Sequence, residues 1–135
     1  MMSGLVLKLN PKERVLVNGA VIENGDRRSK LSILTPNANI LRLRDAIRPD
    51  EVNTPVRRVC YIAQLALSGD AVEGDAKFQI LRGIEQLSQA LRDEDSRNIL
   101  NAATESASRC DFYRTLKTLR SLLPREARLM SSPMN

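Results

Sequence analysis

ERVLVNGAVIENG, at residues 13–25, contains two short apolar runs, each followed by an Asn-Gly pair. These pairs are Asn18-Gly19 and Asn24-Gly25. Asn-Gly tolerates the positive φ angles of a two-residue hairpin turn, so the segment predicts strands joined by tight turns. We expect a three-strand meander whose third strand runs from Lys30 to Thr35.

The segments on either side extend this β pattern. Residues 5–9 read LVLKL and residues 40–44 read ILRLR, and both alternate with the period of two that is typical of a strand. In the second segment, Arg42 and Arg44 are expected to share one strand face. Residues 1–50 therefore predict a small, basic, antiparallel β-sheet, either a meander or a sheet curled like a barrel.

The second half of the chain, residues 51–135, predicts a bundle of about four helices. Thr54 is a good N-cap, and Pro55 suits the first helical position because its missing N–H costs nothing there. Three further helices are expected near residues 75–91, 96–107 and 112–123.

Two details of these helices can be predicted from the spacing of their residues. The second helix is expected to bury a stripe that includes Phe78, Leu81, Leu87 and Leu91. A capping box formed by Ser108 and Asp111 is expected to start the last helix. Strands that precede helices favour an α+β fold, and we expect the two halves to pack together as one compact unit.

The composition excludes several classes of catalytic and metal site. The 135 residues include no His, no Trp and two Cys. Triads that need His, and zinc sites built from His or from four Cys, are therefore absent. We expect no catalytic residues, no metal, no cofactor and no enzymatic activity. Neither a secretion signal nor an apolar run long enough to span a bilayer is visible, so we expect a cytoplasmic protein without membrane contact.

The net charge of +5 comes from the first part of the chain. Residues 1–60 carry eleven basic and six acidic residues, whereas the remainder carries ten of each. Such asymmetry favours a polyanionic partner, and arginine suits RNA because it can bind phosphate and stack on a base. The candidate RNA-binding residues are Arg14, Arg27, Arg28, Lys30, Arg42, Arg44, Arg57 and Arg58. Alternatively, some of them form ion pairs with Asp26, Asp45, Asp50 or Glu51.

A series of short motifs resembles the FlbT family of flagellin regulators. Each motif alone is unspecific, but their order and spacing over residues 5–123 match the family. The motifs are KLNPKER at 8–14, NG at 18–19, DRR at 26–28, ILR at 40–42, TP at 54–55, RR at 57–58 and DFYRTLK at 111–117.

The resemblance implies a post-transcriptional regulator of bacterial flagellum biogenesis. Proteins of this family act on the 5′ untranslated region of flagellin mRNA, where they promote its decay or block translation, and some members act positively. A small protein, FlaF, is the usual counterpart. The alternative function is an adaptor that binds flagellin or FlaF through the helical half, for example through the outer side of Leu116 to Leu123. A homo-oligomer would double the basic patch, and the sequence leaves the oligomeric state open.

Overall fold

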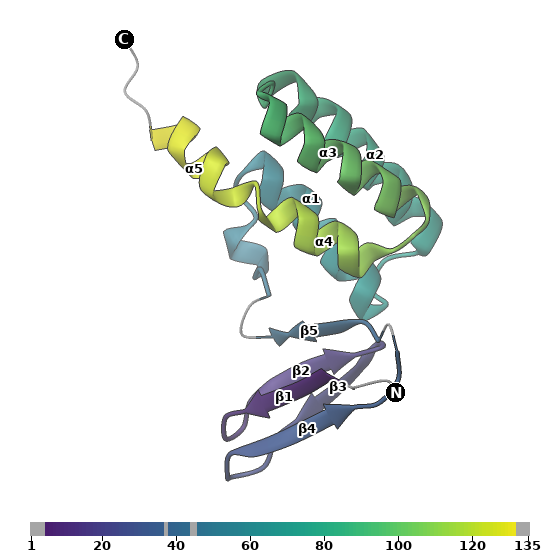
Figure 1. Cartoon of the computed structure of the whole chain (residues 1–135), viewed down its shortest axis with the longest axis vertical. Coiled ribbons are helices and arrows are strands. Elements are labelled where there is room, and N and C mark those ends of the chain that lie inside the picture. The colour runs from purple at the N-terminus through teal and green to yellow at the C-terminus, as the bar shows by residue number, and fades with distance from the viewer. Residues whose placement is uncertain (1–4, 37, 44–45, 132–135) are drawn as a thin grey trace. The chain divides into compact units, whose positions relative to one another are not determined.

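The structure is a computed structural model that describes residues 5–36, 38–43 and 46–131 (Figure 1). The chain divides into two units, a β unit that ends at Ala46 and a helical unit that begins at Ile47. Throughout the described ranges, the strands precede the α-helices, which confirms the predicted α+β fold.

The β unit contains two small antiparallel sheets. The strands of the described residues are β1 (Leu5–Leu9), β2 (Arg14–Val17), β3 (Ala20–Glu23), β4 (Ser29–Ile33) and β5 (Ile40–Arg42). One sheet pairs β1 with β4, and the other has the order β3-β2-β5.

The turn at Asn18-Gly19 is the predicted two-residue hairpin. Asn18 has φ 48° and Gly19 has φ 86°, and Val17 pairs with Ala20 across the turn. Positive φ at both central positions gives the turn whose twist matches the flanking strands. The first Asn-Gly pair therefore forms the β2–β3 hairpin.

The second Asn-Gly pair does not form a hairpin, and the predicted meander is wrong in strand order. Gly25 does not have a positive φ, and β4 pairs with β1 instead of β3. The Asn24 side-chain amide donates to the carbonyls of Asn10 at 2.8 Å and Arg27 at 2.9 Å. Because these bonds tie Asn24 to the residue after β1, the chain returns alongside β1.

One apolar cluster joins the two sheets. It contains the buried residues Leu7 and Leu9 of β1, Val15 of β2 and Ile40 of β5. Leu31 and Ile33 of β4 pack against it. The shared core agrees with the second predicted arrangement, a small sheet region curled on itself.

In residues 47–131, which the structure describes, the helical unit contains a ring of four α-helices followed by a fifth. Its elements are η2 (Pro49–Glu51), α1 (Pro55–Ser68), α2 (Glu73–Ala90), α3 (Glu94–Ser108), α4 (Phe112–Arg120) and α5 (Leu123–Ser131). Both α1 and α3 contact α2 and α4, which closes the ring. Within the described ranges, none of these helices has the length and apolar character to cross a bilayer.

Side-chain caps fix the starts of three helices, and in α3 the cap is Asp93, whose carboxylate accepts from the Ser96 backbone N–H at 3.0 Å. Thr54 Oγ1 accepts from the Arg57 backbone N–H at 3.2 Å, which confirms the predicted start of α1. The carboxylate of Asp111 caps α4 by accepting from the Arg114 backbone N–H at 3.2 Å. Ser108 is the last residue of α3, so the capping box expected there is wrong.

The buried stripe of α2 agrees with the predicted one at Leu87 and Leu91 and differs from it at Phe78. Phe78 is 65% exposed, whereas Ala76, Ile80, Ile84 and Leu87 are buried. These residues follow the i, i+4, i+8, i+11 spacing of one helix face. Phe78 lies two positions from Ile80, about 200° around the helix, and so it falls outside that face.

Candidate nucleic-acid interface

Two of the predicted arginines stabilise the β unit through ion pairs. The Nε and Nη2 atoms of Arg42 both lie 2.6 Å from Glu13 Oε2, and Nη2 also donates to the Lys8 carbonyl at 2.6 Å. These side chains are only 22% and 6% exposed, respectively. Arg14 Nε donates to Glu23 Oε1 at 2.8 Å, and this bond lowers the pKa of Glu23. Both arginines therefore connect neighbouring segments of the fold.

Four further basic residues of the β unit lie in β1, in β4 or immediately before β4. Lys8 pairs with Lys30 across the two strands, on the face opposite the buried Leu7 and Leu9. Arg27 and Arg28 come immediately before β4, and both are exposed. We call Lys8, Lys30, Arg27 and Arg28 the basic strip.

The basic strip has no acidic partner among the described residues. Three of the four acids expected to pair with predicted basic residues bind other cations: Asp26 lies 3.0 Å from Lys12, and Asp50 and Glu51 pair with Arg48. The fourth, Asp45, lies outside the described residues. Like charges placed directly opposite each other on two strands destabilise a sheet. The Lys8–Lys30 pair therefore carries repulsion that a bound anion would relieve.

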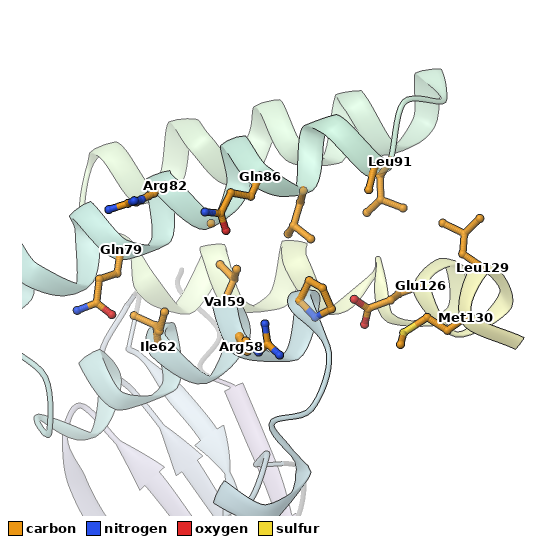
Figure 2. A pocket seen from close by; sticks show the side chains of 14 residues that line it. Arg58, Val59, Ile62, Gln79, Arg82, Gln86, Leu91, Glu126, Leu129 and Met130 are labelled. Carbon is orange, nitrogen blue, oxygen red and sulfur yellow. The ribbon is translucent and has the colours of Figure 1, made fainter.

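Two predicted residues, Arg57 and Arg58, lie at the start of α1 in the helical unit. Arg57 Nη1 donates to Asn53 Oδ1 at 3.1 Å, near the start of α1. Arg58 projects from the same turn and lines an apolar groove with Arg82 of α2 (Figure 2). Arg44 falls outside the described residues. An RNA-binding role for these three arginines stays a prediction.

Comparison with known proteins identifies the family. A model of the FlbT family, described as a flagellar protein, matches residues 5–130. The chain belongs to the FlbT family. It is 30% identical over 124 residues to a Brucella anthropi protein named as a probable flagellum biosynthesis repressor, covering 92% of this chain and 80% of the relative. A Brucella ovis protein of the same name is 29% identical over 126 residues, covering 93% and 82%. No solved structure matches.

One residue of the basic strip of this FlbT-family chain, Lys8, is not among the RNA-binding residues predicted from the sequence. Its outward position follows from its place between Leu7 and Leu9. Its partner Lys30 does not follow, because the expected meander placed residues 30–35 beside residues 20–23 instead of β1. The pairing of the two lysines therefore required the strand register.

The acidic residues and cysteines bear on two kinds of site, a metal site and a reactive thiol. In the described ranges, no group of three His, Cys, Asp or Glu residues could hold a metal ion. Cys60 and Cys110 are both free. Burial raises the pKa of the Cys60 thiol to about 12, which keeps it protonated at neutral pH.

Proposed function

We propose that this FlbT-family member represses flagellum biosynthesis by binding the 5′ untranslated region of flagellin mRNA. Two relatives are named as probable flagellum biosynthesis repressors, which supports a regulatory role. Binding promotes decay of the message or blocks its translation by changing the access of nucleases or ribosomes. The protein itself carries out no chemistry in this scheme.

The observation that supports RNA as the ligand is the basic strip. Opposite residues on paired strands lie about 5 Å apart, so Lys8 and Lys30 can contact one phosphate or two neighbouring phosphates. Arg27 and Arg28 extend the positive charge along the chain before β4. A polyanion is the ligand that best compensates four clustered cations without acidic partners in the described chain.

The composition of the β unit indicates how this RNA is recognised. Residues 1–60 contain no Phe, Tyr or Trp, so base stacking on aromatic side chains does not contribute there. Recognition then depends on phosphate positions and on the shape of a structured leader. A folded leader is therefore expected to bind more tightly than a scrambled RNA of equal length.

A salt titration tests this proposal. Fluorescence anisotropy is measured with labelled flagellin leader RNA and with a scrambled RNA of equal length. Each phosphate contact contributes a log–log salt slope of about −0.7 to −0.9, so the four cations predict a slope near −3. Affinity should then fall about 60-fold between 50 and 200 mM salt.

Charge reversal locates the site. The variant with Lys8, Lys30, Arg27 and Arg28 all replaced by Glu should lose leader binding. Arg92→Glu/Arg97→Glu, on exposed residues of the helical unit, is the control and should retain most of the binding. Unchanged leader affinity in the fourfold variant would contradict the proposed site.

An adaptor role toward flagellin or FlaF is the second candidate function. Its expected binding surface on the last predicted helix has to be replaced by another surface. Leu116 and Leu119 are 1% and 0% exposed, so the expected docking strip from Leu116 to Leu123 is wrong. The groove beside Arg58 and Arg82 favours another face of the helical unit. A pull-down with nuclease treatment separates the two functions, because a direct protein partner remains bound after the RNA is digested.

A further inference from the structure

The helical unit contains an apolar groove between α1, α2 and α5, with a volume of about 560 Å³ (Figure 2). Val59 and Ile62 line it from α1, and Leu91 lines it from the end of α2. Leu129 and Met130 line it from α5. Three helices therefore converge on one elongated apolar surface.

A glycine allows two of the helices that line the groove to approach closely. Gly83 of α2 lines it, and a Cβ atom at this position would lie 2.6 Å from Val59 Cγ2. That distance is too short for two carbon atoms, so the absence of a side chain lets α1 and α2 approach closely. The Val59 side chain then forms part of the lining beside Gly83.

Polar contacts at its first turn hold α5 as a wall of the groove. Glu126 Oε2 accepts from the Val56 backbone N–H at 2.9 Å, and Arg125 Nη1 lies 2.9 Å from Asp93 Oδ2. Beyond this turn, Leu129 and Met130 are 58% and 62% exposed. The helix is thus fixed at one end while its apolar residues stay accessible.

The charged groups of the groove indicate the occupant. Arg58 and Arg82 are exposed, and neither forms an ion pair with any residue that the structure describes. Glu126 is the acidic lining residue, and its carboxylate is buried against the start of α1. A complementary ligand therefore combines an apolar face with carboxylates at its margin.

We propose that this groove binds an amphipathic helix of a partner protein, with acidic side chains that face Arg58 and Arg82. Its apolar face would pack on Ile62, Leu129 and Met130. The α2 lining residues run from Gln79 to Ala90, a rise of about 17 Å, which matches a helix of about 11 residues. Helices that dock in this way use apolar anchors at i, i+3, i+4 and i+7. The proposal does not depend on RNA binding by the β unit.

The probe is a labelled synthetic helix of about four turns, with Leu at the anchor positions and Glu along both margins. A second peptide has Lys in place of each Glu. Anisotropy with the full chain should show binding of the acidic peptide and much weaker binding of the basic one. Arg58→Glu/Arg82→Glu should lower the affinity for the acidic peptide by roughly tenfold or more and raise the affinity for the basic peptide.

Control variants separate the groove from net charge and from general apolar contact. Arg92→Glu/Arg97→Glu makes the same change in charge outside the groove, and its affinity for the acidic peptide should match that of the unmodified chain. Leu129→Ser/Met130→Ser should lower the affinity for the acidic peptide several-fold. Phe78→Ser removes an equally exposed apolar residue outside the groove and should leave binding unchanged.

Three results would overturn the proposal. The first is equal affinity for the acidic and basic peptides. The second is a concentration-dependent dimer in sedimentation that Leu129→Ser/Met130→Ser dissociates, which would assign the groove to a second copy of the chain. The third is loss of leader RNA binding in Arg58→Glu/Arg82→Glu, which would assign both arginines to RNA.

Discussion

Reversing either lysine of the Lys8–Lys30 pair should stabilise the β unit and weaken RNA binding at the same time. Two unit charges about 5 Å apart in water interact by about 0.8 kcal/mol. Physiological salt screens roughly half of this energy. Because Lys30→Glu turns repulsion into attraction, it should stabilise the β1–β4 pairing by up to about 0.8 kcal/mol.

The complete double-mutant cycle makes this prediction specific. Lys8→Glu should stabilise the strands as Lys30→Glu does. The double variant places Glu opposite Glu, so repulsion returns and the stability should fall back to that of the unmodified chain. Leader affinity should instead decrease progressively from the unmodified chain through the single variants to the double variant.

Hydrogen exchange of the β1 and β4 amides is the appropriate assay, because it reports local opening of these two strands. A stabilisation of about 0.8 kcal/mol slows exchange about fourfold in each single variant. Anisotropy with leader RNA gives the affinities of the same four proteins. Additive changes in exchange across the cycle would refute the assigned register or the repulsion. Stabilised single variants with unchanged leader affinity would refute the binding role.

Three further predictions concern the stability of the two units. Arg42→Ala should destabilise the β unit by about 2 kcal/mol, measured by urea unfolding, because it leaves Glu13 Oε2 without its guanidinium. Gly83→Ala should lower the urea midpoint, because the new Cβ overlaps the buried Val59. The Ser96 side chain and backbone N–H, together with a neighbouring guanidinium, lower the pKa of Asp93 below its ordinary 3.8. The ionised Asp93 therefore contributes to stability above pH 3.8, and this contribution is lost as the pH falls through the lowered pKa. Asp93→Asn should lower the free energy of unfolding at neutral pH but leave it unchanged in strong acid.

Each of these predictions has a matched control. Arg14→Ala removes an exposed ion pair and should destabilise the β unit less than Arg42→Ala does, so an equal loss in both arginine variants would contradict the role of burial. Gly74→Ala, at a position of α2 with open space around the missing Cβ, should not destabilise the protein. A loss at Gly74 equal to that at Gly83 would contradict the steric argument. A difference between Asp93→Asn and the unmodified chain that persists at all pH values would contradict the titration of Asp93.

The two Asn-Gly pairs show how far local sequence determines the β unit. At Asn18-Gly19 the flanking residues Val17 and Ala20 pair with each other across the turn, so the dipeptide is sufficient to predict the hairpin. At Asn24-Gly25 the side-chain amide of Asn24 binds carbonyls at Asn10 and Arg27 instead. The contact with Asn10 is long-range, and a pattern of turn residues does not encode it.

The helical unit shows a similar division between caps and core. Thr54 and Pro55 specify the start of α1 by themselves, because a cap involves only residues within one turn. The core face of α2 depends on the neighbouring helices as well. Phe78 is the largest apolar residue of α2, yet the close contact at Gly83 helps to set a face centred on Ile80 and Ile84.

The candidate site follows from charge together with the pairing of its neighbours. The sequence correctly limits the excess of basic residues to the first 60 positions but does not rank them. In the structure, Arg42 binds the Glu13 carboxylate and the Lys8 carbonyl, whereas Lys30 lies opposite another cation. A residue already held by a carboxylate gains little from a phosphate, whereas a repelling pair gains more. The predicted meander gave the wrong strand pairing. The observed register therefore identifies, within a generally basic surface, the Lys8–Lys30 pair as the specific candidate for phosphate binding.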